Sequence, residues 1–142
     1  RANLSRAMSP SQEYLAWEVV AKFGVDLEPS YNRAPFVFIG SAIAFNRQSK
    51  NGSLPITKAL ANVYPDSGPG KARLRRLLAC KTTEEVCQVL RPIVRLTCQK
   101  NQAIDWVRLL KDIKNFHWHQ DSVKASWAQN FFSGMKKGEK DA

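Results

Sequence analysis

The sequence is poor in the residues from which disulfide frameworks and metal centres are built. It has two histidines and three cysteines in 142 residues. The cysteines, Cys80, Cys87 and Cys98, are odd in number and none forms a CxxC pair. This pattern argues against a disulfide framework or a thiolate zinc site and suits a reducing cytosol. We therefore expect three free thiols that act as small buried side chains.

Motifs for nucleotide binding and nucleophilic catalysis are also missing. The chain has no GxGxxG, no GxxxxGK[ST] and no GxSxG, which removes the usual phosphate cradles and the serine-hydrolase elbow. The GPGK at 68–71 is a loop with a lysine rather than a phosphate-binding loop. We expect no catalytic residues and no cofactor.

Long hydrophobic runs are absent as well. The longest apolar stretch, Ala34 to Phe45, is interrupted by Gly40 and Ser41 and is too short to span a bilayer. No secretory signal is visible. These observations predict a cytoplasmic chain without a membrane partner.

Acidic residues are scarce beside basic ones. Lys and Arg number 22 against 12 Asp and Glu, a net charge of +10, and the pI is about 9.9. Such a balance points to a polyanionic partner, with nucleic acid first and an anionic membrane surface second.

Hydrophobic periodicity predicts helices along most of the chain. The run FVFIGSAIAF at 36–45 could be a buried strand or helix by periodicity alone, and we favour helix because no partner strand is visible. The fold class is therefore all-α, a compact bundle of about six to seven helices. The expected helices span 9–24, 36–45, 53–63, 71–80, 82–99, 101–116 and 121–134.

Loops and helix ends follow from turn and capping residues. Residues 25–35 and YPDSGPG at 64–70 are expected to be loops, the second being the strongest break. We expect one domain over 1–134, which could divide into two lobes near 64–71, and a charged tail over 135–142. Pro92 should kink its helix. The expected caps are Ser9 with Gln12, Ser53, Thr82 with Glu85, Asn101, and Asp121 or Ser122.

Both histidines lie in NFHWHQDSVKASWAQNFF, residues 115–132. A zinc site needs three or four ligands, and helical pairs are usually four apart, whereas His117 and His119 are two apart. We therefore expect no metal, and expect Trp118 to be a packing or interface residue. A small hydrolase or metalloprotein using His117 and His119 stays as a rival hypothesis.

Basic residues repeat at helical spacing on two predicted helices. Arg73 and Arg76, then Arg91 and Arg95, would form one cationic surface if their helices pack side by side. Phosphate binding needs several such cations presented together. Aromatic residues do not interleave with them along the sequence, so we expect backbone contact without base readout. A free-standing helical DNA-binding regulator is the alternative function.

Five segments follow one another in an order typical of a known family. They are ITKALANVY (56–64), KARLRRLLAC (71–80), VLRPIVRL (89–96), AIDWVRLLKDIKNF (103–116) and SWAQNFFSG (126–134), with RANLSRA (1–7) as a partial sixth. In this order they resemble the small subunit of the type I-E CRISPR Cascade complex, the CasB family.

The resemblance implies an all-α protein without catalytic activity in an RNA-guided antiviral complex. Its implied partners are the backbone and large Cascade subunits, a second copy of itself, the CRISPR guide RNA, and target DNA, especially the displaced strand of the R-loop. Carried onto this chain, it indicates Arg6, Lys58, Arg73 and Arg91 as nucleic-acid contacts. Local charge adds Arg1, Arg76, Arg95, Arg108 and Lys111, and we expect cations from separate helices to form one continuous strip.

Overall fold

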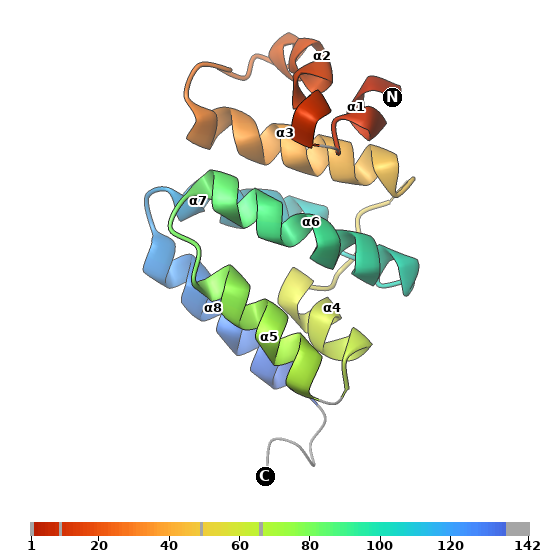
Figure 1. Ribbon diagram of the computed structural model, residues 1–142, viewed down its shortest axis with the longest axis vertical. Coiled ribbons are helices and arrows are strands. Elements are labelled where there is room, and N and C mark those ends of the chain that lie inside the picture. Colours follow the sequence, from red (N-terminus) through yellow and green to blue (C-terminus); the bar gives the residue numbers. More distant parts are fainter. Residues whose placement is uncertain (1, 9, 49, 66, 136–142) are drawn as a thin grey trace.

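The computed structural model describes residues 2–8, 10–48, 50–65 and 67–135, and these residues are helical apart from their connections (Figure 1). The described part contains no strand, only an isolated bridge between Leu54 and Ile104, so the all-α prediction is confirmed. In chain order the elements are α1 (Ala2–Arg6), the 3-10 helix η1 (Pro10–Ala16), α2 (Trp17–Lys22), α3 (Ser30–Phe45), α4 (Ile56–Val63), α5 (Ser67–Leu78), α6 (Thr83–Gln99), α7 (Trp106–Phe116) and α8 (Gln120–Gly134).

The first expected helix is in fact two elements. Gln12 has non-helical backbone angles (φ −120°, ψ 15°), so η1 forms first and only α2 is a regular α-helix. Gly24 ends this segment with φ +80°, as expected from its lack of a Cβ. Ser9, the expected cap, lies outside the described residues.

Two other helices begin earlier than expected. α3 starts at Ser30 and takes in Pro35, and α5 starts at Ser67 and takes in the SGPG sequence. Pro69 lies in the first turn of α5, where proline costs little because the first N–H groups have no partner inside the helix. Pro35 lies past the first turn of α3, where it removes the usual helical donor to the Tyr31 carbonyl. α6 likewise runs unbroken through Pro92.

The helix caps were harder to predict than the helices. Thr82 caps α6 as expected, since its Oγ1 accepts from the Glu85 backbone N–H at 3.2 Å. The other caps predicted within the described residues were wrong. α4 begins after Pro55 rather than Ser53, and α7 begins after Asp105 rather than Asn101. α8 begins after His119 rather than Asp121 or Ser122. Asn101 instead has φ +59° in the turn that follows α6.

α3 lies between two hydrophobic cores (Figure 1). The larger core joins α3 to the five helices that follow it. The smaller one joins Val37 of α3 to Ala7, Ala16 and Val20 of the N-terminal layer. α3 therefore buries apolar side chains on more than one face, which explains why its apolar run is nearly continuous.

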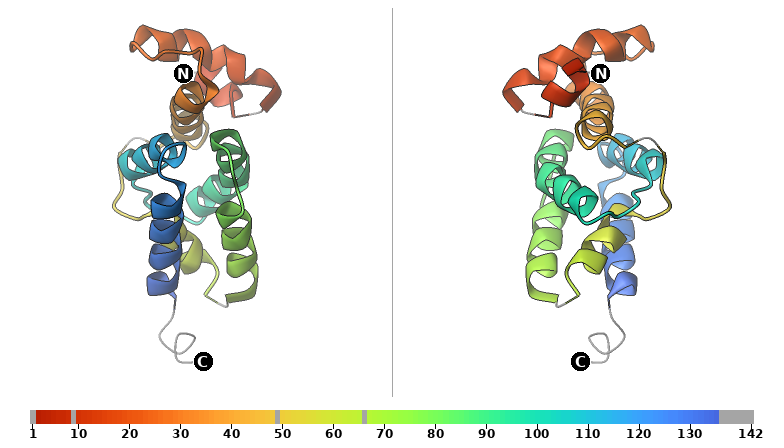
Figure 2. Two further views of the ribbon diagram at one scale, coloured as in Figure 1. Left: turned by 90° about the vertical axis from the view of Figure 1, so that its left-hand side faces the viewer. Right: turned by 90° about the vertical axis from the view of Figure 1, so that its right-hand side faces the viewer.

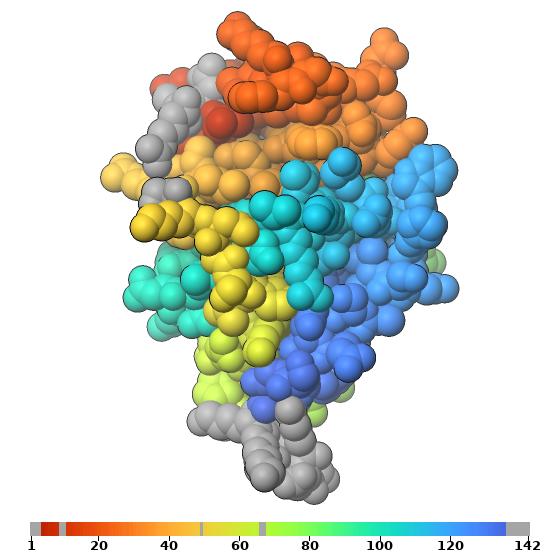
Figure 3. Space-filling view, turned by 180° about the vertical axis from the view of Figure 1, so that it is seen from behind, coloured from red at the N-terminus to blue at the C-terminus, as the bar shows by residue number. Residues whose placement is uncertain are grey.

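A short strap ties two distant connections together. The N–H of Gly52 donates to the Ile104 carbonyl at 2.8 Å, that of Leu54 to Ala103 at 3.0 Å, and that of Asp105 back to Leu54 at 2.9 Å. In Figure 3 the strap is the yellow segment lying against the cyan residues before α7. It fixes the start of α4 beside the start of α7.

α4 and α8 pack closely below the strap. The Thr57 hydroxyl donates to the Trp127 carbonyl at 2.7 Å, and both residues are fully buried, as is Phe131. Trp127 and Phe131 thus form the inner face of α8, whereas Phe132 is 46% exposed.

Candidate nucleic-acid interface

α5 and α6 diverge from a tight turn, and a groove of about 310 Å³ lies between them. Arg73 and Arg76 of α5 line one wall, and Gln88 and Pro92 of α6 line the other. The two helices do pack side by side, as the cationic-surface hypothesis required. The groove therefore opens between a basic wall and a neutral polar wall.

The outer face of α6 extends this surface. Gln88, Pro92, Arg95 and Gln99 are all exposed, and their spacing of three or four residues places them along one side of the helix. We call Arg73, Arg76, Arg95 and the groove between helices α5 and α6 the α5–α6 face. Neither Arg76 nor Arg95 has a carboxylate partner within salt-bridge distance in the part of the chain that the structure describes.

Aromatic rings support two of these arginines. The Arg73 guanidinium carbon lies 4.9 Å from the centre of the Tyr64 ring, and that of Arg95 lies 4.7 Å from the centre of the Phe45 ring. Both contacts fit cation–π geometry. These aromatic residues are separated from the arginines along the chain but meet them in the fold.

Arg91 is placed differently from its neighbours on α6. Its guanidinium forms an ion pair with Glu13 of η1, and only 11% of its side chain is exposed. It lines a small cavity with Trp17, Arg33 and Glu84. Because its charge is matched by a carboxylate, Arg91 does not add a free cation to the α5–α6 face.

The remaining predicted contacts lie elsewhere. α5 and α6 are on one side of the molecule and α7 and α8 on the other (Figure 2). Arg108 and Lys111 belong to α7 and are exposed, and Arg108 reaches Ser126 of α8 at 3.5 Å. Lys58 contributes atoms beside Gly134 at the end of α8, and Arg6 is exposed on α1. The expectation of one continuous strip was wrong, and Arg1 lies outside the described residues.

Few cations are neutralised within the fold. Over residues 2–8, 10–48, 50–65 and 67–135, ion pairs engage only Lys22 with Glu18 and Arg91 with Glu13. The first of these is exposed on both sides and contributes little. Most of the positive charge is therefore available to an outside anion.

The histidines do not converge on a metal. The His117 ring stacks on Tyr31 with centroids 4.1 Å apart, and His119 is the residue before α8. In the described part of the chain, no group of three His, Cys, Asp or Glu side chains could hold a metal ion. The cysteines are free there; Cys80 and Cys87 are buried and Cys98 is half-buried.

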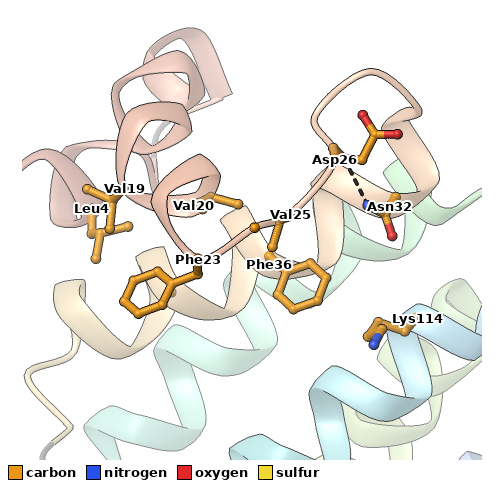
Figure 4. Close-up of a pocket in the computed structure, with 11 residues that line it drawn as sticks. Leu4, Val19, Val20, Phe23, Val25, Asp26, Asn32, Phe36 and Lys114 are labelled. Atoms are coloured by element: carbon orange, nitrogen blue, oxygen red, sulfur yellow. Dashed lines mark hydrogen bonds between the residues drawn. The ribbon is translucent and has the colours of Figure 1, made fainter.

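A further groove, of about 680 Å³, is mainly apolar and lies under the N-terminal layer. Figure 4 shows Leu4, Val20, Phe23 and Phe36 around it, with Lys114 of α7 across from them. It is separate from the α5–α6 face. Among the described helices, none combines the length and apolar character needed to cross a bilayer.

Comparison with known proteins connects this geometry to a family. The family model described as CRISPR-associated protein Cse2 matches residues 1–132. A crystal structure of a CRISPR-associated protein of the Cse2 family from Thermus thermophilus has a TM-score of 0.72 to this chain, with 20% sequence identity over 93% of this chain and 84% of that one. A search of curated protein sequences found no match.

The structural neighbour shows that the two chains share a fold, and the family model covers nearly the whole sequence. The matched range contains the ordered segments from 56–64 to the WAQNFF sequence that ends at residue 132. The chain belongs to the CRISPR-associated Cse2 family, the family of the type I-E Cascade small subunit.

Proposed function

We propose that this Cascade small subunit is non-catalytic and binds the sugar–phosphate backbone of the displaced DNA strand, stabilising the R-loop in antiviral defence. The observation that carries the proposal is the α5–α6 face: Arg73 and Arg76 line the groove, Arg95 is exposed on α6, and none of the three pairs with a carboxylate among the described residues. The neighbouring Cascade subunits, a second copy of the chain and the guide RNA complete the proposed assembly.

The chemistry of this face suits phosphate rather than base recognition. Guanidinium groups bind phosphate oxygens through paired N–H donors, and release of counterions drives the association. In an RNA-guided complex, base pairing with the guide selects the sequence, so a protein subunit needs only a positive surface for the strand. Roles for Arg6, Lys58, Arg91, Arg108 and Lys111 stay predictions, and Arg91 would first have to leave Glu13.

The test compares two double variants on opposite sides of the molecule. Arg73→Ala/Arg76→Ala removes two cations from the α5–α6 face, and Arg108→Ala/Lys111→Ala removes the same charge from α7. Single-stranded DNA affinity is measured as a function of salt concentration. The first variant should weaken binding and reduce the log–log salt slope by about 0.7 per lost contact, so by about 1.4 for two contacts.

The α7 variant removes the same net charge from the other side of the molecule. Arg108 and Lys111 are themselves predicted contacts, but the proposal expects their loss to change the salt slope much less. Equal slopes for both variants would show that overall charge, and not this face, governs binding. Competition with unrelated duplex DNA separates the proposal from a sequence-specific regulator, which would prefer one duplex sequence. The Cascade proposal expects little sequence preference.

A further inference from the structure

Three side chains form an exposed ring cluster where α3 begins and α7 ends. His117 stacks on Tyr31 with the ring planes 14° apart. Trp118 meets Tyr31 edge-on at 5.6 Å and His117 edge-on at 4.6 Å. Trp118 is 65% exposed, far more than the buried Trp106 and Trp127. We call Tyr31, His117 and Trp118 the ring cluster.

The position of the ring cluster follows from the turn that joins α7 to α8. The Trp118 and His119 N–H groups donate to the Asn115 carbonyl at 3.1 and 2.8 Å, so this turn is tightly closed. The rings of His117 and Trp118 are held against α3 by Tyr31. An indole that is fixed in place but still open to solvent is a ready stacking surface, because little side-chain freedom is lost when a planar group covers it.

The ring cluster is close to the end of α5. The Gln120 side-chain amide donates to the Lys81 carbonyl at 2.9 Å, which joins the α7–α8 turn to the α5–α6 turn. Figure 1 shows these two turns on the same, left-hand side of the molecule. Lys81 is exposed and follows the end of α5, so a cation lies in the turn that contacts the α7–α8 turn.

We propose that Trp118, supported by Tyr31 and His117, stacks against an unpaired nucleobase of a single strand whose phosphates run along α5. This inference rests on the proposed function and adds to it a contact with a base. Stacking on an aromatic ring tolerates every base because each has a π-face. The contact therefore gives affinity for unpaired strands without reading their sequence.

Continuity with the cations favours a nucleobase over a protein side chain. An aromatic side chain beside a basic track is the arrangement that single-strand-binding proteins use, where cations follow the backbone and rings take the bases. A duplex keeps its bases paired and stacked on one another, so the same contact would favour single strands. Glu84, Glu85 and Asp121 also lie on the elements around the ring cluster, which limits the phosphate track to the α5 side.

The experiment removes the ring and the base separately. The 142-residue chain and its Trp118→Ala variant are titrated with an oligothymidine of about 12 nucleotides and with a deoxyribose-phosphate strand of equal length without bases. We expect Trp118→Ala to weaken oligothymidine binding at least about fivefold, equivalent to about 1 kcal/mol, and to leave binding of the baseless strand unchanged. Trp118→Phe should restore most of the affinity.

Phe132→Ala is the matched control, because it removes an exposed ring near the opposite end of α8; it should change neither affinity. If Trp118→Ala weakens both strands equally, or neither, base stacking is overturned. If the Arg73→Ala/Arg76→Ala variant still weakens binding in that case, phosphate contact stands and only the stacking inference fails. If the unaltered chain binds neither strand, the proposed function fails as well.

Discussion

At the scale of single residues, the three thiols differ in their contact with water. Cys80 and Cys87 are each 3% exposed, and burial raises the pKa of both thiols. Cys98 is half-buried, and burial raises the pKa of this thiol to about 11. Because the thiolate is the reactive form, the folded protein should resist thiol chemistry at neutral pH.

We expect a thiol-reactive dye at pH 8 to label the folded chain slowly and at Cys98 first. With a pKa of about 11, Cys98 holds roughly two orders of magnitude less thiolate than an ordinary cysteine of pKa about 8.5. Its labelling rate should rise about tenfold per pH unit between pH 8 and 10, still below that pKa. Mass spectrometry identifies the site, and Cys98→Ser is the control. Rapid labelling of Cys87 before unfolding would contradict the buried assignment.

Arg91 and Arg95 show what a sequence can and cannot say about a charged residue. Their spacing correctly placed Arg95 on the exposed side of α6, whereas Arg91 packs against η1. It could not show that Glu13, 78 residues earlier, pairs with Arg91, or that Phe45 lies under Arg95. The fate of each charge depends on neighbours that only the folded chain brings close.

At the scale of elements, the start of α7 is held by two side chains rather than one. Asp105 accepts from the Arg108 N–H at 3.1 Å and from the Asn51 side-chain amide at 3.0 Å. Asn51 in turn accepts from the Trp106 N–H at 2.6 Å. The first N–H groups of α7 have no acceptor within the helix. They donate instead to Asp105, just before α7, and to Asn51 in the α3–α4 connection.

Asp105→Asn should destabilise the protein by about 0.5–1 kcal/mol at pH 6. The hydrogen bond from Asn51, then that from the Arg108 N–H, lowers the pKa of Asp105. A carboxyl group whose pKa is lowered by folding stabilises the folded protein fully at pH values above its pKa in the unfolded chain, about 3.9. This stabilisation is lost as the pH falls through the pKa of the group in the folded protein. Urea unfolding should therefore show the two chains converging as the solution is acidified. A constant difference from pH 6 down to strong acid would contradict the charge-based effect.

The helices and their caps show which elements a sequence can predict. Periodicity located α4, α6 and α7, because each turns a clear apolar stripe inward and tertiary packing agrees with it. α3 was predicted to be a helix only because no partner strand was visible. Thr82 was found as a cap because its whole motif lies within one local segment. Asp105 was missed although its bond from the Arg108 N–H is local, because Asn101 offered an earlier capping residue. Its second partner, Asn51, is 54 residues away and could not be found from a local pattern. The 64–70 break was drawn too long because Pro and Gly also fit a helix start.

At the scale of the whole molecule, the strap around Gly52 joins halves of the chain that the sequence keeps apart. A Cβ at Gly52 would lie 2.1 Å from the Ala103 carbonyl oxygen and 2.2 Å from its carbon. These are backbone atoms and cannot rotate away. Close approach, and not a special turn, is what requires glycine here.

Gly52→Ala should therefore lower the free energy of unfolding by more than about 2 kcal/mol, because the strap must separate. Gly68→Ala is the matched control, since a Cβ there meets nothing within 4 Å and alanine favours the helix by up to about 1 kcal/mol. Urea unfolding followed by circular dichroism measures both. Equal stability for the two variants would show that the strap can shift freely.

The candidate site was predicted in its parts but not in its arrangement. Arg73, Arg76 and Arg95 were identified from helical spacing, whereas the packing of α5 beside α6 was only a condition of the hypothesis. The separation of Arg108 and Lys111 onto another side depends on how α7 packs against α3 and α8, which no local pattern encodes. The ring cluster was missed for the same reason, since Tyr31 and Trp118 come from opposite ends of the chain.

The position of α3 between two cores also limits how the chain can be shortened. Val37 faces a covering layer formed by Ala7, Ala16 and Val20, while Phe38 and Ala42 face the larger core. Deleting this layer would expose the apolar side chains of α3 that it covers to water. Exposed apolar surfaces promote self-association. We therefore expect a fragment that begins at α3 to aggregate unless detergent covers this surface.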